Sequence, residues 1–523
     1  MIRRALVFLT LVLFARTAAS AQLTPPLGAA LTPPPQVARE FRAVWATPIW
    51  DRGFTDFPSK PGLTAEEQRA EIDAMLDRSA ALGLNAVIMH VRMAGDALYP
   101  TTFAPWSAFL SGTSGVGPSP AYDPLAYAVE QAHARGLQLH AWFNPFRAML
   151  PNFAGHAAST HVTRAHPEWI RTYGTQTWID PGDPAARKFV LETILDVARR
   201  YNVDGVHIDD YFYPYRESKL VRRRVRGKRV TSRVDIPFPD DKTWKKYGKP
   251  NGFVDRDAWR RANIDGFIRD LYKNIKAIKP TMLVGISPFG IWRPGSPSGI
   301  TGLDAYGEIY ADSKRWLAEG WLDYLAPQLY WEVDGKENRF RLLDDWWRSV
   351  NPQHRYIWPA LYTSHIYGGH DAWPLGEIRN QITTIRATRL GSPDAPGEVH
   401  FRLGALFADN NRLASDLAAA AYSERALVPA FPWLDPTVPA APIVAVVPMN
   451  GPMSITVAPG DSTPVRWWLV QTRARDGRWT TNVRPAGGGM LPSDAFGTED
   501  PDEVAVTAIS ATGVASAPTI ISP

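Results

Sequence analysis

The sequence predicts an α/β fold, a (β/α)8 TIM barrel followed by a small all-β domain. Apolar, β-rich runs alternate with amphipathic helical stretches from about residue 38 to 427, and eight such alternations are typical of a TIM barrel rather than of a doubly wound sheet. Beyond Pro429 the chain changes to short, proline-punctuated strands, which are typical of an immunoglobulin or fibronectin type III module. We therefore assign residues 38–428 to the barrel and 429–523 to a β-sandwich-like domain. The proline-rich stretch 22–37 predicts an extended linker.

The beginning of the chain predicts export. Arg3 and Arg4 precede an apolar run at 5–15, and small residues then lead to a cleavage site after Ala21, so residues 1–21 are interpreted as a signal peptide. The apolar run is too short to span a bilayer, and no later stretch approaches ~20 uninterrupted apolar residues. We expect no membrane span and an exported protein, either periplasmic or secreted.

Composition narrows the class of ligand. The absence of cysteine excludes a disulfide framework, and the 20 Trp and 18 Tyr fit a carbohydrate site as well as a large core. The net charge is only +5, and the basic excess is local to the segment 216–233. Such a run is usually a solvated loop, and for an exported chain without a nucleic-acid fold a polyanionic glycan is the more natural partner than nucleic acid.

The eight predicted strands can be placed in order. A capping box at Thr64 and Glu67 begins the first helix between them, and Ile72, Met75 and Leu76 give that helix one apolar face. The predicted strands are 41–48, 85–92, 138–144, 205–210, 283–289, 324–332, 356–363 and 401–408.

Strand alternation selects the side chains that face the barrel interior, because successive residues point to opposite faces. In the fourth strand Val206 and Ile208 face the helices, which turns His207 and Asp209 inward. The same reasoning turns a set of polar and aromatic residues of the second, third and sixth strands inward: His90, Arg92, His140, Trp142, Asn144, Gln328, Tyr330 and Glu332.

These residues converge where TIM barrels keep their sites, at the C-terminal ends of the strands. Asp209 and Glu332 form the pair of acids that a glycosidase needs, one protonated to release the leaving sugar and the other ionised as nucleophile or base. The aromatic neighbours of Glu332 favour Glu332 as the acid and Asp209 as the nucleophile or base. Asp210 is the second choice, and its proximity would set the pKa of its partner. We expect neither cofactor nor metal. The predicted ligands of sugar hydroxyls and carboxylates are His90, Arg92, His140, Asn144, His207 and Gln328, and the predicted stacking surfaces are Trp142, Tyr330 and Trp331.

Two other functions stay open. The cluster of His207, Asp209 and Asp210, completed by His90 or His140, could hold zinc in a metal-dependent deacetylase or amidohydrolase, although one strand supplies only two inward ligands. A non-catalytic glycan-binding protein could also retain the barrel. The presence of both proposed acids argues against the second alternative.

Six motifs are distinctive in combination: FRAVW (41–45), HVRMAGDA (90–97), PWS (105–107), HAWFNPFR (140–147), DGVHIDDY (204–211) and APQLYW (326–331). Together they resemble the glycosyl-hydrolase-like family 10. The similarity extends over about residues 38–408 and implies an exported bacterial TIM barrel that hydrolyses peptidoglycan glycan strands stripped of their peptides. The chain differs from that pattern in its longer basic segment, 216–233, and in lacking the cysteine of a lipoprotein.

The resemblance gives the basic segment a possible role. A peptide-free strand bears a lactyl carboxylate on every muramic acid, so arginines beside the site would act as an electrostatic clamp. Neutralising them should raise KM on such strands and remove most of its salt dependence.

Overall fold

The computed structural model describes residues 31–153, 155–225, 228–336, 338–367, 369–390, 392–409, 412–447, 454–487, 489–491, 496 and 501–523. The predicted signal peptide, 1–21, lies outside these residues. The first described segment, 31–37, forms neither helix nor strand. Throughout the described ranges, no helix combines the length and the apolar character needed to cross a bilayer.

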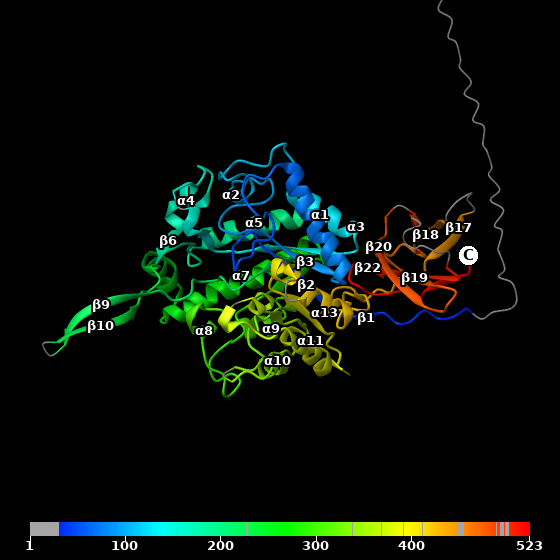
Figure 1. Ribbon diagram of the computed structural model, residues 1–523. Helices are drawn as coiled ribbons and strands as arrows, with labels where there is room; N and C mark the ends of the chain where they lie inside the picture. The colour runs from blue at the N-terminus through cyan, green and yellow to red at the C-terminus, as the bar shows by residue number, and fades with distance from the viewer. Residues whose placement is uncertain are drawn as a thin grey trace, which may run out of the picture.

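A parallel sheet forms the centre of the larger domain (Figure 1). The described residues contribute nine strand segments to it, in the spatial order β13-β12-β11-β8-β4-β3-β2-β15-β14. Because β13 and β14 are separated only by Trp358 and Pro359, both ends of this order belong to one stretch of chain, and the sheet closes into a (β/α)8-like barrel. The segments are β2 (Phe41–Ala46), β3 (Ala86–Arg92), β4 (Gln138–Phe143), β8 (Gly205–Ile208), β11 (Leu283–Ile286), β12 (Tyr324–Leu325), β13 (Tyr356–Ile357), β14 (Ala360–Leu361) and β15 (Gly397–His400).

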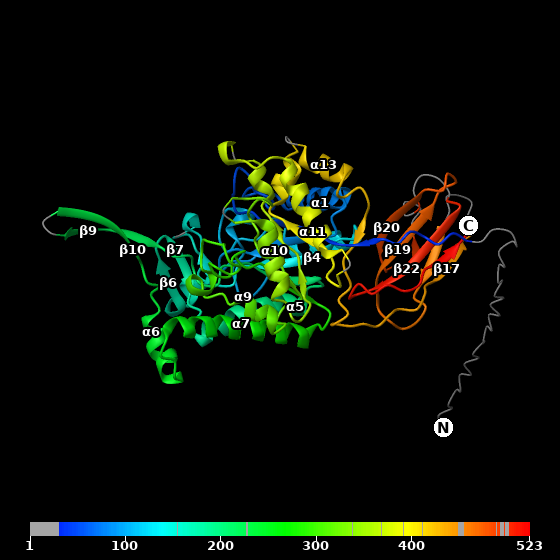
Figure 2. The ribbon, with the colours of Figure 1, turned by 90° about the horizontal axis from the view of Figure 1, so that it is seen from below.

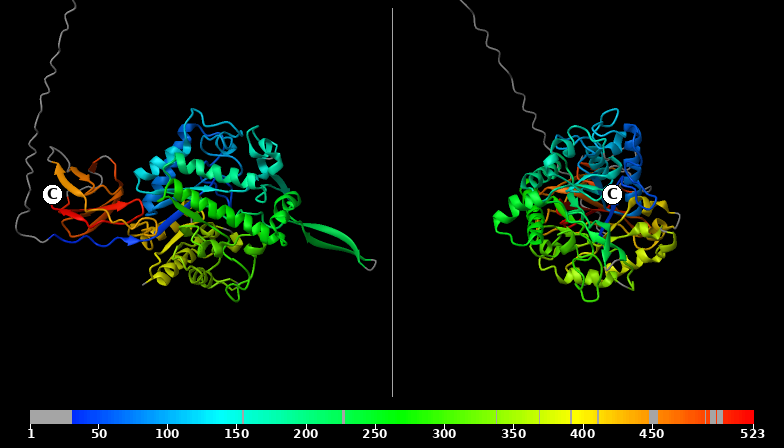
Figure 3. Two further views of the ribbon diagram at one scale, coloured as in Figure 1. Left: turned by 180° about the vertical axis from the view of Figure 1, so that it is seen from behind. Right: turned by 90° about the vertical axis from the view of Figure 1, so that its left-hand side faces the viewer.

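Helices surround this sheet (Figure 3). The first of them begins at the predicted capping box, in which the Thr64 hydroxyl accepts from the Glu67 backbone and the Glu67 carboxylate accepts from the Thr64 backbone. The longer helices are α1 (Ala65–Leu82), α3 (Pro124–Ala134), α5 (Pro184–Arg200), α7 (Arg256–Ile278), α9 (Ser313–Ala318), α10 (Phe340–Ser349), α11 (Gly376–Arg389), α12 (Leu403–Ala408) and α13 (Leu413–Ala419). The shorter helices in the connections are α2 (Ala108–Ser111), α4 (Val162–Ala165), α6 (Asp241–Thr243) and α8 (Ala305–Glu308).

Side-chain alternation divides the barrel core into two layers. Val206 and Ile208 of β8 join the apolar cluster that the sheet shares with the helices, as predicted. Trp142 of β4 instead belongs to the cluster inside the barrel, with Phe41 and Tyr324. The strands therefore present one face to the helices and the other to the interior, and the interior face continues into the mouth of the barrel.

The predicted eighth strand, 401–408, is wrong. The strand is β15, which ends at His400, and residues 403–408 form helix α12. The strand was missed because Glu398 and His400 are charged residue types, yet both are buried, and the Tyr422 hydroxyl connects them: it donates to Glu398 over 2.5 Å and lies 2.7 Å from His400 Nε2.

Two β-structured insertions between barrel strands and the helices that follow them extend the mouth of the barrel. Between β4 and α5 the chain forms a small antiparallel sheet of β5 (Arg147–Met149), β7 (Gln176–Ile179) and β6 (Ile170–Tyr173). Between β8 and α7 it forms a hairpin of β9 (Ser218–Val225) and β10 (Lys228–Asp235), which corresponds to the predicted basic segment and projects away from the barrel (Figures 1 and 2).

An all-β unit of two antiparallel sheets covers the other end of the barrel. The Arg466 guanidinium lies 2.8 Å from Asp204, the residue just before β8, and so connects this unit to the bottom of the sheet. Burial alone would raise the pKa of Asp204, but His133 and Arg466 lower that pKa to about 2. The strands of this unit are β17 (Ile443–Val447), β18 (Ser454–Ala458) and β21 (Met490–Leu491) in one sheet and β19 (Val465–Arg473), β20 (Trp479–Pro485), β22 (Glu503–Ser510) and β23 (Thr519–Ile521) in the other.

The chain enters and leaves the barrel at this same end. Strand β1 (Ala38–Arg39) pairs in parallel with β16 (Ala426–Leu427), and residues before it contact the all-β unit through a bond of 2.9 Å from the Gln471 amide to the Pro35 carbonyl. The barrel mouth is therefore left to the loops that follow the strands.

Candidate active site

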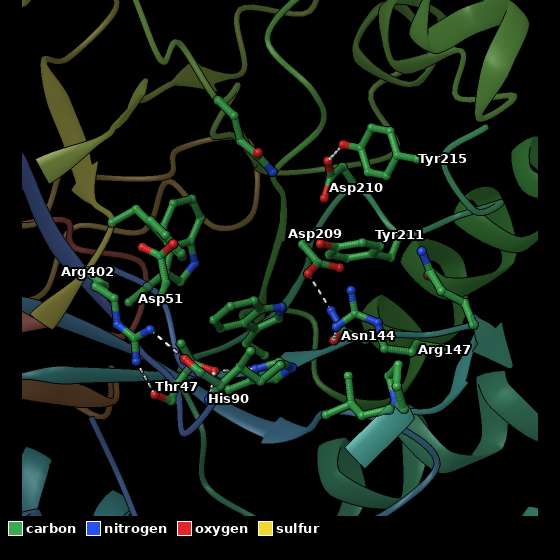
Figure 4. A pocket seen from close by; sticks show the side chains of 18 of the residues that line it. Thr47, Asp51, His90, Asn144, Arg147, Asp209, Asp210, Tyr211, Tyr215 and Arg402 are labelled. Carbon is green, nitrogen blue, oxygen red and sulfur yellow. Dashed lines mark hydrogen bonds between the residues drawn. The ribbon is translucent and has the colours of Figure 1, made fainter. Parts of the chain in front are cut away.

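A cavity of about 580 Å³ opens at the C-terminal end of the barrel strands (Figure 4). Seven sequence-predicted residues from four of the predicted strands line it: His90, Trp142, Asn144, Asp209, Asp210, Gln328 and Tyr330. These side chains come together because each follows or ends a strand of the same closed sheet.

Two consecutive carboxyl groups, those of Asp209 and Asp210, form one wall of the cavity. Both side chains are almost fully buried, with 4% of each residue exposed. Burial, together with the neighbouring carboxylate of Asp210, raises the pKa of Asp209 to about 8. Burial also raises the pKa of Asp210, against a hydrogen bond that the Tyr215 hydroxyl donates to it. The two acids together therefore retain a proton to higher pH than an isolated carboxyl group does.

A short relay orients Asp209. The Arg147 guanidinium donates to the Asn144 Oδ1 atom over 3.0 Å, which turns the Asn144 amide nitrogen toward Asp209, where it donates to Oδ2. Arg147 is itself held over the Tyr211 ring, 3.7 Å from the ring centroid. The second oxygen of Asp209, Oδ1, is buried and makes no hydrogen bond within the described structure.

Aromatic rings form the floor. Trp142 stacks on His90 with ring centroids 3.8 Å apart, and Trp45 lies against Trp142 at 6.0 Å. Burial and the nearby Arg147 lower the pKa of His90 well below its usual value, so this imidazole is neutral. The indole nitrogen of Trp142 is buried, with no partner among the described residues. An unsatisfied buried donor in a cavity wall is a feature that a ligand acceptor would complete.

Asp51 lies on the opposite side of the cavity from Asp209 (Figure 4). Its Oδ2 atom accepts a hydrogen bond of 3.0 Å from the Ser364 hydroxyl. Tyr330, whose pKa is raised by burial and then by Asp210 and Asp51, is close enough to sense both carboxylates. The cavity thus places Asp51 across from the Asp209 and Asp210 wall.

Three predicted ligands do not line the cavity. His140 and His207 lie one layer deeper, where their Nδ1 atoms are 2.8 Å and 3.0 Å from the Tyr324 hydroxyl. Arg92 was predicted to point inward beside His90, but a register shift between these two residues breaks the alternation. Its guanidinium is buried and donates to the Asn144 carbonyl over 2.8 Å. These three residues support the cavity from behind.

Glu332 and Trp331 line a neighbouring cavity of about 510 Å³, which shares Tyr330 with the first. Glu332 is exposed, and it is absent from the wall that holds Asp209. The prediction that it faces the barrel interior is wrong because β12 ends at Leu325, so strand alternation no longer fixes the direction of side chains seven residues further on.

Sequence reasoning missed several cavity residues. They include Trp45, Thr47, Asp51, Arg147, Tyr211, Tyr215 and Arg402. Trp45, Arg147 and Tyr211 stand within the motifs FRAVW, HAWFNPFR and DGVHIDDY, which were the available signal for them. Asp51, Tyr215 and Arg402 stand outside those motifs, in loops or at a helix start, where no strand period applies.

The zinc alternative lacks a converging ligand set. In the described part of the chain no group of three or more His, Asp or Glu side chains is placed to hold a metal ion. Besides its contact with Tyr324, His207 accepts a hydrogen bond of 3.3 Å from the Trp45 indole. The histidines that the alternative needs are thus engaged inside the barrel.

A cavity lined by carboxyl groups and aromatic rings at the C-terminal ends of the strands is typical of the class of TIM-barrel enzymes. Within that class the chain belongs to the glycosyl hydrolase-like 10 family, whose model matches residues 40–367. This confirms the resemblance read from the motifs.

Individual relatives extend the match. Glycosyl hydrolase YngK of Bacillus subtilis is 37% identical over 416 residues, which are 78% of this chain and 76% of that protein. Glycosyl hydrolase DigH of Escherichia coli K12 is 34% identical over 369 residues, 66% of this chain and 79% of that protein. Among solved structures, the PgaB (BpsB) glycoside hydrolase domain from Bordetella bronchiseptica aligns with a TM-score of 0.45 at 13% identity, over 72% of this chain and 98% of that one.

Proposed function

We propose that this protein is a glycoside hydrolase that cleaves glycosidic bonds within a carbohydrate polymer. The observation that carries the proposal is Asp209, a carboxyl group held protonated at neutral pH in the wall of an aromatic-lined cavity, with the carboxylate of Asp51 across from it. Family membership supports the same reaction class.

Asp209 acts as the general acid. As the bond between the anomeric carbon and the leaving oxygen breaks, Asp209 gives its proton to that oxygen. Asp210 contributes to the raised pKa of Asp209, and Asn144 holds the Oδ2 atom. We assign the proton to the Oδ1 atom, which is buried and makes no hydrogen bond among the described residues.

The second carboxylate completes the reaction. It either attacks the anomeric carbon or removes a proton from the attacking water, and the separation of the two carboxyl groups decides between retention and inversion. The sequence predicted Glu332 as the partner of Asp209, with Glu332 as the acid and Asp209 as the nucleophile or base. Glu332 instead lies in the neighbouring cavity, whereas Asp51 shares the cavity of Asp209. We therefore assign the role to Asp51 and assign Glu332, with Trp331, to contacts with an adjoining sugar.

The substrate we propose is a peptide-free peptidoglycan glycan strand, degraded outside the cytosol. The predicted signal peptide supports export, and the stacked rings of Trp142 and His90 offer a flat apolar floor for a sugar ring. The relatives named glycosyl hydrolases support the reaction class, and the basic hairpin supports an anionic polymer.

Hydrolysis assays on mature protein test the proposal. The protein is incubated with peptide-free peptidoglycan strands and with neutral glycans, and the products are identified by mass spectrometry. We expect wild type to release short oligosaccharides, Asp209→Asn and Asp51→Asn to lose at least about 100-fold in kcat, and Glu332→Gln to keep kcat while KM rises.

The two assignments of the second acid give opposite results. A collapse of kcat in Glu332→Gln, with normal turnover by Asp51→Asn, would restore Glu332 as the catalytic partner of Asp209. Absence of cleavage of every glycan by wild type would overturn the proposed function.

A further inference from the structure

The hairpin β9–β10 is rooted in the cavity wall. Tyr211 and Tyr215, which follow the two cavity aspartates in the chain, line the cavity, and β9 begins at Ser218. From there the hairpin runs outward beyond the barrel, at the end opposite to the all-β unit (Figures 1 to 3). A ligand that leaves the cavity along this loop would meet the hairpin next.

The strand register sorts the basic residues by face. Directly opposed residues of an antiparallel pair point to the same side, and residues two apart along each strand do so as well. The pairs Leu220 with Arg233, Arg222 with Thr231 and Arg224 with Arg229 therefore share one side. We call its four cationic residues the arginine face: Arg222, Arg224, Arg229 and Arg233.

The two sides of the hairpin differ in composition and burial. All four residues of the arginine face are exposed, whereas the opposite side combines the exposed Lys219 and Arg223 with the partly buried Val221, Ser232 and Val234. The guanidinium groups therefore stand free in solvent, on two adjacent strands about 5 Å apart.

Hairpin stability does not explain this arrangement. Within the described ranges, no carboxylate lies at ion-pair distance from the arginine face; the acids at the base of the hairpin, Asp235 and Glu308, lie 3.4 Å and 3.5 Å from Arg216 instead. Arg224 directly opposes Arg229, and like charges in that position destabilise a two-stranded hairpin that is marginal by itself. An anionic ligand would relieve the repulsion.

We propose that the arginine face binds a linear, carboxylate-bearing polysaccharide as it extends out of the cavity. This inference rests on the proposed function, which places the polymer in the cavity at the root of the hairpin. Guanidinium groups suit the partner because each can hold a carboxylate with two parallel hydrogen bonds. Strands of 8 residues reach about 26 Å, so the contact is made with sugars well beyond the cleavage point.

Binding measurements in a non-cleaving background test this inference. The Asp209→Asn protein, with and without the fourfold change of the arginine face to glutamine, is titrated with fluorescently labelled glycans. Peptide-free peptidoglycan strands are compared with N-acetylchito-oligosaccharides of equal length, which share the backbone and lack the carboxylates. Tetrasaccharides of each kind serve as ligands too short to reach the hairpin.

We expect the fourfold variant to raise the Kd for long anionic strands at least fivefold at low salt, since each exposed ion pair contributes only modestly. The Kd values for the neutral glycans and for the tetrasaccharides should not change. At about 1 M salt, where screening extends to ~3 Å, the difference should disappear.

Two control variants distinguish binding by the arginine face from a general effect of the protein's positive charge. One replaces Lys219 and Arg223, on the other side of the hairpin, by glutamine. The other replaces four exposed arginines elsewhere, namely Arg78, Arg199, Arg269 and Arg475. Both should bind long anionic strands within about twofold of the parent.

Three results would overturn the inference. The first is an unchanged Kd of the fourfold variant for long anionic strands. The second is an equal loss of affinity for those strands in the variant with four distant changes. The third would come from a parallel titration with anionic phospholipid vesicles, if the fourfold variant lost binding to the vesicles and kept its binding to glycans. If the wild type cleaves glycans in these cases, only the hairpin inference fails. If the protein neither binds nor cleaves any glycan, the proposed function fails and this inference fails with it.

Discussion

Replacing Asp209 by asparagine should abolish activity and, at the same time, stabilise the barrel in a manner that depends on pH. With a pKa of about 8 in the folded chain and ~3.9 in the unfolded one, Asp209 keeps a proton on folding that the unfolded chain has released between pH 4 and pH 8. In that window wild-type stability falls as pH rises, by up to about 1.4 kcal/mol per pH unit. Asparagine cannot ionise, so the variant escapes this loss.

The size of the effect follows from the burial. From pH 5 to pH 7 the advantage of Asp209→Asn should grow by up to about 3 kcal/mol. Because Asp210 titrates with Asp209, and water can enter the cavity, we expect a growth of at least about 1 kcal/mol. The asparagine oxygen can still accept from Asn144, so little is lost in packing or hydrogen bonding.

Urea unfolding followed by tryptophan fluorescence at pH 5, 6 and 7 measures the difference. Glu332→Gln is the matched control, because Glu332 is exposed and its removal should give a difference that does not change with pH. Unfolding midpoints of Asp209→Asn and wild type that stay equally spaced from pH 5 to pH 7 would refute the raised pKa of Asp209, and with it the proton on which the mechanism depends.

Three further outcomes follow from the same contacts. If Asp209 must be protonated, kcat/KM should fall tenfold per pH unit above an alkaline limit at about pH 8. A pH profile in which kcat/KM begins to fall at a lower pH would contradict this. Arg147 lowers the pKa of Asp209, so Arg147→Met should move this alkaline limit to higher pH while it reduces kcat, and a shift to lower pH would show that the charge acts otherwise. Arg466→Gln should cost about 2 kcal/mol of stability near pH 7, because it removes a charged partner and leaves the buried Asp204 with His133 and the Leu139 backbone N–H. Since the pKa of Asp204 is lowered by these partners, that difference should diminish as pH falls toward 2, and urea midpoints measured at several pH values test it.

Strand alternation predicted the part of the site that stands on regular strands. Trp142 and Asn144 at the end of β4 and Asp209 after β8 line the cavity because the barrel sheet fixes the direction of every second side chain. Strand alternation does not predict how far below the mouth of the barrel an inward side chain lies. His140 and His207 have the predicted direction but lie one layer below the cavity.

The failures share a physical cause, which is the loss of the strand period. The register shift before Arg92 and the early end of β12, seven residues before Glu332, each cancel the alternation from which their directions were taken. Asp51 and Tyr215 come from loops, whose conformation depends on tertiary contacts such as the bond from Ser364 to Asp51. A sequence pattern of period two contains no information about them.

The predicted eighth strand failed for a different reason. An apolar run at 401–408 was preferred to β15, in which Glu398 is buried. Burial, followed by the charge of Glu40, raises the pKa of Glu398 to about 8, so this residue enters the core in its neutral form. Hydrophobicity scales treat such a residue as charged, and they therefore do not predict β15 as a buried strand.

The closed end of the barrel has a consequence for how the molecule can be tethered. The chain enters at β1 beside β16, and the carboxyl terminus lies in the all-β unit that covers the same end (Figure 2). Any fusion partner, bead or surface joined through residue 523 would therefore hold the cavity and the hairpin facing outward. A polymer too large to diffuse could then be approached by the whole catalytic face at once, without the point of attachment standing in its path.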